Sequence, residues 1–231
     1  MPTSNGNKKN FQTNKYNLMF SLVLSHNKRS KEYLKIFKKN KIFFDYIFIY
    51  NVSQNHLYPY CKKLFLYKKK KLDKNLKKII LKKKIKNLII NPGDGEIINK
   101  EITKELNLFH CHPGKLPDFK GSAVIYYSLL EKNKIFCTIF RISSEIDRGK
   151  IMFQQEHKIP NWKKINYINF DNQIRAKTLL NFLKKNRNII FKSKNSKSPN
   201  YYIPHPVLRY FSLNKLKLKN DLKRLTTKFS F

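Results

Sequence analysis

The sequence predicts one α/β domain with a mainly parallel sheet and helices on both of its faces. Near-continuous apolar runs at 18–24, 43–50 and 87–90 are typical of strands that are buried on both faces. Amphipathic segments at 25–40 and 70–84 lie between these runs, and such alternation favours parallel strands joined by right-handed crossovers. A chain of 231 residues suffices for one sizeable core but is short for two.

The expected helices begin at residues whose side chains can accept a backbone hydrogen bond. Ser25 or Asn27 is expected to cap the first helix, and Ser122 to cap a helix that runs through Leu130. Asp171 is expected to cap a last helix. The remaining strands are expected at 106–112, 136–142 and 151–157.

Ligand sites in open α/β sheets lie beyond the carboxyl ends of the strands. The loops that begin at Asn91, His112 and Ser143 each follow an expected strand, so we expect them to share that edge of the sheet. Outside the domain, which we place at 17–190, residues 1–16 are polar and predict a disordered tail. Residues 191–231 predict a C-terminal extension that packs on the domain and ends in a basic tail.

The net charge of +36 has two interpretations. One is polyanion binding, and the other is a solvated surface on which lysine is simply the common polar residue. The cysteines Cys61, Cys111 and Cys137 are odd in number and widely spaced, which is typical of a reducing compartment. No apolar run approaches the ~20 residues of a membrane span, so we expect a cytoplasmic protein with no membrane partner.

The stretch FHCHPGKLPDFKG, at 109–121, carries the candidate chemistry. Residues two apart on a strand point to the same face, so His110 and His112 are expected to present their imidazoles together. Pro113 and Gly114 end the strand directly after them. Asp147 lies in a later Ile-Asp-Arg-Gly turn, and a histidine beside a carboxylate is a common arrangement for moving protons near neutral pH.

The order of these motifs closely resembles the formyltransferase family, which transfers the formyl group of 10-formyltetrahydrofolate to amines. The shared pattern is a strand, then His-Pro-Gly-x-Leu-Pro-x-x-Lys-Gly, a helix, a strand and Asp-x-Gly. The resemblance implies a Rossmann-like formyltransferase fold and 10-formyltetrahydrofolate as cofactor. It covers roughly 18–157, and the short C-terminal extension and the Pro-Gly resemble the sugar N-formyltransferases most.

The resemblance also implies roles for individual residues. His112 matches the catalytic histidine, which assists deprotonation of the amine, and Asp147 matches the catalytic aspartate, which orients His112 and relays protons. His110 stands where most of the family has an asparagine that stabilises the oxyanion, and an imidazole N–H can donate the same bond. The residues expected to bind the cofactor are Asn91, Gly93, Gly95, Ile97, Ser144, Glu145 and Ile146. The residues expected to bind the substrate are Pro113, Gly114, Lys115 and Lys120.

Three substrate classes compete within this family. Glycinamide ribonucleotide formyltransferases have a glycine-rich phosphate loop after the first strand, where this chain reads SHNKRSKEY. Methionyl-tRNA formyltransferases append a barrel domain, for which the stretch after His157 is too short, although the charge keeps tRNA as an alternative partner. An amino sugar carried on a nucleotide remains as the expected small-molecule substrate, for the synthesis of a surface glycan.

The residues alone also leave a metal site and a non-catalytic role open. The two histidines could form a metal site with Asp147 or His157, but a metal does not require the Pro-Gly-x-Leu-Pro stretch, so we expect none. The departure at His110 would also suit a formyltransferase-like module that binds without catalysing. For the assembly, both a monomer and a homodimer fit the sequence.

Overall fold

The structure, a computed structural model, describes residues 20–52, 61–69, 71–93, 96–185 and 199–214. The expected tail at 1–16 and parts of the expected extension at 191–231 lie outside these residues. Within the described ranges, the helices are all too short or too polar to cross a membrane.

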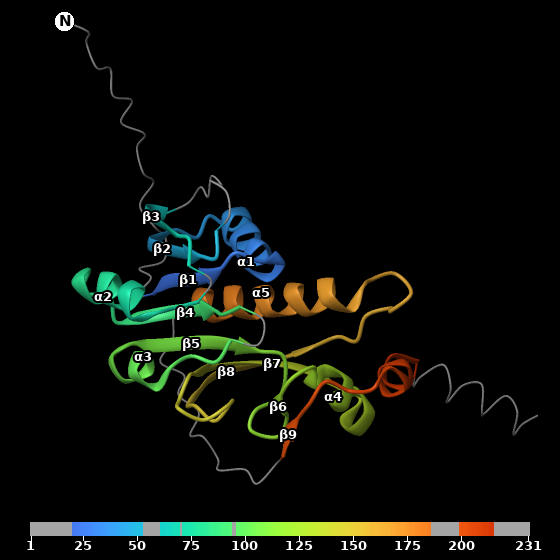
Figure 1. Cartoon of the computed structure of the whole chain (residues 1–231). Helices are drawn as coiled ribbons and strands as arrows, with labels where there is room; N and C mark the ends of the chain where they lie inside the picture. Colours follow the sequence, from blue (N-terminus) through green and yellow to red (C-terminus); the bar gives the residue numbers. More distant parts are fainter. Residues whose placement is uncertain (1–19, 53–60, 70, 94–95, 186–198, 215–231) are drawn as a thin grey trace, which may run out of the picture.

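A 7-stranded sheet in the order β3-β2-β1-β4-β5-β7-β8 forms the centre of the fold (Figure 1). The first five of these strands run parallel to one another, and β7 and β8 are antiparallel to their neighbours. The strands are β1 (Ser21–Ser25), β2 (Phe44–Tyr50), β3 (Cys61–Tyr67), β4 (Asn87–Asn91), β5 (Asn107–His112), β7 (Ile135–Arg141) and β8 (Ile151–His157). The expectation of a mainly parallel α/β sheet is therefore confirmed.

Helices cover both faces of the sheet because neighbouring residues of a buried strand point to opposite sides. Leu22 and Leu24 of β1 pack with α1 and α5, whereas Val23 packs with α2 and α3. In Figure 1, α5 runs along the sheet beside α1, and α2 lies on the other side of β1 and β4. The helices are α1 (Lys28–Lys39), α2 (Lys74–Lys82), α3 (Lys100–Glu105), α4 (Val124–Lys132) and α5 (Tyr167–Lys185), with a further helical stretch at 206–214.

The expected helix starts are partly wrong. Asn27 caps α1 as expected, accepting a hydrogen bond from the Ser30 N–H at 2.9 Å. The cap of α4 is Ala123 rather than Ser122, and the Ser122 N–H binds the carbonyl of Tyr201. Asp171 lies inside α5, which begins at Tyr167, and its carboxylate binds a side chain of its own helix instead of the helix end.

Three further features of the strands differ from the expectation or were not anticipated. The loop that begins at Ser143 was expected on the same side of the sheet as His112. It leaves from the opposite ends of the strands, because β7 is antiparallel to β5. Strand β3 has no counterpart in the sequence prediction, since its CKKLFLY sequence carries lysines, which suit an edge strand. A small parallel ribbon of β6 (Lys120–Gly121) and β9 (Asn200–Tyr201) joins the motif loop to the C-terminal segment.

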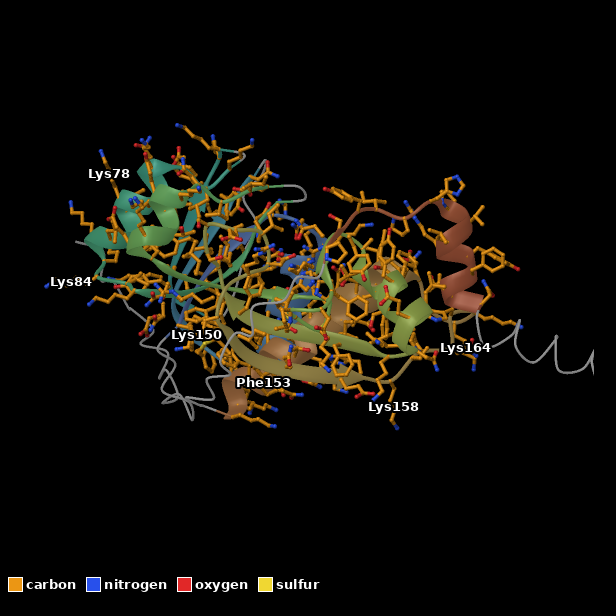
Figure 2. The ribbon with its side chains drawn as sticks, turned by 90° about the horizontal axis from the view of Figure 1, so that it is seen from below. Lys78, Lys84, Lys150, Phe153, Lys158 and Lys164 are labelled. Atoms are coloured by element: carbon orange, nitrogen blue, oxygen red, sulfur yellow. The ribbon has the colours of Figure 1, made fainter. Side chains whose placement is uncertain are left out.

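The lysines of the described surface are widely distributed. Lys78 and Lys84 lie at one end of the molecule in Figure 2, and Lys158 and Lys164 lie at its lower rim and opposite end, all of them exposed. Because these charges come from separate elements, they fit a generally solvated surface better than a single binding ridge.

Candidate active site

His112 is the last residue of β5, and both of its ring nitrogens face an acceptor. Nε2 lies 2.7 Å from the carbonyl oxygen of Phe119, and Nδ1 lies 3.4 Å from Oδ2 of Asp147. A carbonyl oxygen only accepts, so the hydrogen-bond partners assign a proton to Nε2. Burial lowers the pKa of His112, and the Asp147 carboxylate opposes that effect.

In the neutral ring, Nδ1 is therefore unprotonated and faces a carboxylate oxygen. Two acceptors at this separation gain a hydrogen bond when one proton is placed between them. The pair formed by His112 and Asp147 is thus arranged to take up one proton. Of the two side chains, Asp147 is the more exposed, at 14% against 3% for His112.

Asp147 reaches His112 through an unusual loop between β7 and β8. Its φ of 52° lies in the left-handed region, which aspartate tolerates better than most residues. Oδ2 also accepts a hydrogen bond from the Gly121 N–H at 2.8 Å. Two residues on, a Cβ on Gly149 would lie only 1.5 Å from the carbonyl oxygen of Arg141, so the return of the loop requires glycine there.

His110 lies on the same face of β5 as His112, as the spacing predicts. Its Nδ1 lies 3.2 Å from the carbonyl oxygen of Ile90, so in this geometry Nδ1 donates. Burial and then the charge of Arg175 lower the pKa of His110 to about 3, and the ring is neutral at ordinary pH. The neutral ring bonded to Ile90 has no proton on Nε2.

The motif loop after His112 is braced from both sides. Thr138 on β7 donates to the carbonyl of Gly114 at 2.6 Å and accepts from the Leu116 N–H at 3.2 Å. Gly121, with a φ of 100°, lies so close to β9 that an added Cβ would be 2.2 Å from the carbonyl oxygen of Tyr201. The C-terminal ribbon therefore holds the end of the loop that binds Asp147.

The residues expected to bind the substrate have different environments. Pro113 and Gly114 are buried, and Lys115 is exposed with its ammonium 5.5 Å from the centre of the Phe136 ring. Lys120 is 1% exposed, and its ammonium has no hydrogen-bond partner among the described residues. Burial lowers the pKa of Lys120, and Arg148 adds to that effect. A buried amine without a partner is a ready site for an anionic group.

The residues expected to bind the cofactor are not all available. The Asn91 side chain is fully buried and donates to Ser30 and Asn27 of the α1 region. The Gly93 N–H binds the carboxylate of Glu96 at 2.9 Å, and Gly95 lies outside the described residues. Ile97 at the end of this loop is 81% exposed.

The second expected cofactor loop is open to solvent. Ser144 and Glu145 are exposed, and Glu145 pairs with Arg148 at 2.9 Å. Ile146 is 53% exposed and is adjacent to Asp147. Each of the two expected cofactor loops therefore presents an exposed isoleucine to solvent.

Several residues of the site were not anticipated from the sequence. The Glu96 carboxylate accepts hydrogen bonds from the Tyr50 hydroxyl at 2.6 Å and from the Leu72 N–H at 2.9 Å. These bonds attach the end of the first expected cofactor loop to β2 and to the segment before α2. Arg175 and Asp171 on α5 form a buried pair behind β5. Charged residues four apart on the apolar face of a helix could have indicated this pair. The described residues contain no cluster of three or more metal-binding side chains.

Comparison with known proteins places this geometry in a family. The family profile described as formyl transferase matches residues 10–170. A sugar N-formyltransferase from Shewanella sp. superposes with a TM-score of 0.52 at 17% identity, over 84% of this chain and 86% of that one. A 4-N formyltransferase from Francisella tularensis gives a TM-score of 0.53 at 15% identity, over 84% of this chain and 88% of that one.

The fold is also similar to that of the methionyl-tRNA formyltransferase from Clostridium thermocellum, with a TM-score of 0.52 at 15% identity, over 82% of this chain and 74% of that one. A search of the curated proteins finds no match to the sequence. At such identities the solved structures show the fold alone, whereas the profile covers well over half of the chain. The chain therefore belongs to the formyl transferase family and is a folate-dependent one-carbon transferase.

Proposed function

We propose that this chain transfers the formyl group of 10-formyltetrahydrofolate to the amine of a nucleotide-linked amino sugar. The observation that carries the proposal is the pair of His112 and Asp147, which meet at 3.4 Å beside the end of β5 and are arranged to take up one proton. Formylation of an amine moves one proton from the attacking nitrogen to N10 of the departing tetrahydrofolate, and a neighbouring base is needed to carry that proton.

In this proposal, His112 is the proton acceptor and Asp147 is the relay. Burial keeps His112 neutral before the reaction, and a proton at Nδ1 is then stabilised by the facing carboxylate. Because Asp147 is the more exposed member, it is the one that contacts the amine, directly or through a water molecule. The Phe119 carbonyl holds the ring in this orientation through Nε2.

His110 occupies the position beside the formyl oxygen, where negative charge develops. To donate there, its Nε2 must carry the proton, which means the other neutral tautomer and loss of the bond to Ile90. A donor in this position contributes about 2.7–4 kcal/mol to transition-state stabilisation in comparable sites. The family's usual asparagine needs no such change of tautomer.

The residues at the two loops fit the folate. A pterin is flat and has hydrogen-bonding edges, so it suits backbone groups flanked by apolar side chains. Ile97 and Ile146 supply exposed apolar surface, and the backbone at 91–93, 96–97 and 144–147 supplies the polar groups. When bound, 10-formyltetrahydrofolate supplies an activated formyl group.

Two observations support an amino sugar over the other amines. The turn after β1 contains no glycine, and Asn27 is used to cap α1, so a phosphate cradle of the ribonucleotide type has no place there. The similar sugar N-formyltransferase covers most of both chains. We assign Pro113, Gly114, Lys115 and Lys120 to the substrate side, with Lys120 pairing with an anionic group such as a phosphate.

The test is an amine formylation assay with purified protein and 10-formyltetrahydrofolate. A panel of nucleotide-linked amino sugars is compared with glycinamide ribonucleotide and with methionyl-tRNA. We expect tetrahydrofolate to be released with one of the sugars. We expect this release to be lost in His112→Ala and Asp147→Asn. Turnover with only the ribonucleotide or the tRNA would overturn the sugar assignment, and folate binding without any turnover would indicate a binding module.

A further inference from the structure

The histidines lie on a part of β5 that extends beyond its backbone pairing with β4. The pairing of β4 with β5 runs from Asn87–Asn107 to Ile89–Phe109, so the last three residues of β5 have only β7 as a paired neighbour. On the β4 side, the buried backbone groups of this strand end need hydrogen-bond partners from outside the sheet. The reactive geometry therefore depends on what braces this end.

Arg175 supplies such a brace from behind the sheet. Its Nη1 donates to the carbonyl oxygen of Cys111 at 2.6 Å, and Cys111 lies between the two histidines. Its Nε donates to Oδ1 of Asp171 at 2.8 Å, one turn earlier on α5. Both side chains are buried, with exposed fractions of 9% and 11%. Charge-assisted bonds of this kind are shorter and stronger than neutral ones.

Asp171 extends the connection to the expected cofactor loop that begins at Asn91. Its second carboxylate oxygen lies 3.7 Å from Nη2 of Arg29 on α1, and Arg29 donates to the Asn91 side chain at 3.3 Å. Asn91 is the last residue of β4, where the 91–97 loop begins. One carboxylate thus connects the end of β4 with the end of β5.

We propose that Arg175 and Asp171 are positioning residues, which hold the histidine-bearing end of β5 in register with the start of the 91–97 loop. Neither residue has to touch a substrate. Their function is to fix the peptide at Cys111 and, through Arg29, the side chain of Asn91. The effect on rate rests on the proposed function, whereas the effect on the two histidines is independent of it.

The charges around the histidines make the proposal testable. The groups that face His112 are Asp147 from the β7–β8 loop, Arg175 and Asp171 from α5, and the Phe119 carbonyl. Further titratable or charged groups near the histidine pair are His110 on β5, Lys120 on β6 and Arg29 on α1. Arg175 lowers the pKa of His112 and Asp171 raises it, so the two substitutions have opposite predicted signs.

The experiment compares Arg175→Gln, Arg175→Lys and Asp171→Asn with Lys177→Gln, which removes an exposed charge from the same helix. Histidine ring signals are titrated by NMR in the protein without ligands, after thermal unfolding has shown which variants fold. We expect the pKa of His112 to rise in Arg175→Gln and to fall in Asp171→Asn. A substitution that only loosened the packing would expose the His112 ring to solvent. The pKa of His112 would then rise in both Arg175→Gln and Asp171→Asn.

Arg175→Lys separates charge from geometry. Lysine keeps the positive charge but is a single point donor, and it cannot bridge Asp171 and the Cys111 carbonyl as the guanidinium does. We expect kcat to fall by up to about 100-fold with KM nearly unchanged, because misplacement of reacting groups by ~1 Å has such an effect. Wild-type kcat in Arg175→Lys would overturn the proposal.

A measurement on the unsubstituted chain covers the case in which the variants do not fold. The Nε proton of Arg175 should exchange with solvent much more slowly than those of exposed arginines, because it is bonded to Asp171 in a buried position. Rapid exchange would overturn the brace. If the brace is confirmed and no amine is formylated, the positioning role stands and the proposed reaction fails.

Discussion

The carboxylate of Asp147 lies 3.4 Å from Nδ1 of His112, although the strands that precede them along the chain end at opposite ends of the sheet. His112 ends β5, and Asp147 follows β7, which runs antiparallel to it. The loop after β7 must therefore fold back along the face of the sheet. The Gly121 N–H then holds the carboxylate at 2.8 Å, so the contact depends on the path of the loop.

Asp147→Asn should lower kcat by about 10²–10⁴-fold, the usual range for loss of a proton-transfer group. Because the Asp147 charge raises the pKa of His112, its removal should also move the acid limb of the rate profile to lower pH. The measurement is kcat/KM against pH for both proteins. Glu156→Gln, an exposed carboxylate on β8, is the control, and an acid limb that moves upward would contradict the prediction.

Gly149→Ala should displace Asp147 without changing it. The new methyl group would lie 1.5 Å from the Arg141 carbonyl oxygen, so the loop has to shift. We expect a lower kcat together with a lower unfolding temperature, measured by circular dichroism. Lys150→Ala, at the exposed neighbouring position, should leave both values near wild type. Equal behaviour of the two variants would show that the return of the loop tolerates a side chain.

His110→Asn should retain or increase activity, since an amide donates a hydrogen bond without a change of tautomer. His110→Ala should lower kcat by about 10²–10³-fold if the position contributes a donor to the formyl oxygen. The comparison of kcat for the two variants is the measurement. Wild-type activity in the alanine variant would remove His110 from the transition state.

The lowered pKa of His110 also predicts acid sensitivity of the fold. Its pKa is lowered by burial from 6.5 to about 3, so between these values the unfolded chain binds a proton that the folded chain does not. Stability should therefore fall as the pH drops below about 6.5. Thermal unfolding midpoints measured from pH 7 downward should decrease less steeply in His110→Asn than in the wild type. Parallel curves would argue against a depressed pKa.

Tyr201→Ala should loosen the motif loop from its far end. The Tyr201 ring stacks on the Phe119 ring, with the two ring centroids 5.6 Å apart, and the Phe119 carbonyl accepts a hydrogen bond from His112. We expect a lower kcat, with faster amide exchange at Gly121, because its strand pairs with β9 and its N–H binds Asp147. Tyr210→Ala, at a 57% exposed position of the C-terminal helix, should change neither. Unchanged exchange at Gly121 in Tyr201→Ala would count against the coupling.

Much of the fold could be predicted from local patterns. The apolar runs became β1, β2 and β4, and the His-x-His spacing placed both imidazoles on one face of β5. Periodicity alone decides these features, because burial on both faces requires continuous apolar residues and a strand has a period of two. The lysine-bearing strand β3 was missed for the same reason, since an edge strand does not need such a run.

Residues with several uses were assigned wrongly from the sequence. Asp171 and Ser122 are good cap residues, but Asp171 binds Arg175 inside α5 and the Ser122 N–H binds the Tyr201 carbonyl. Asn91 follows a strand, yet its side chain is buried against α1. For Asp171 and Asn91, a side-chain partner in the folded chain outweighed the local preference.

The sequence by itself determined the α/β class, the strand that carries His110 and His112, and the family to which the chain belongs. These follow from hydrophobic period and motif spacing, which are local properties of the chain. Only the tertiary structure decided the contact of Asp147 with His112, the brace from Arg175 and the ribbon of β6 with β9. Each of these joins residues that are more than twenty positions apart, and such contacts exist only after packing has ordered the backbone between them.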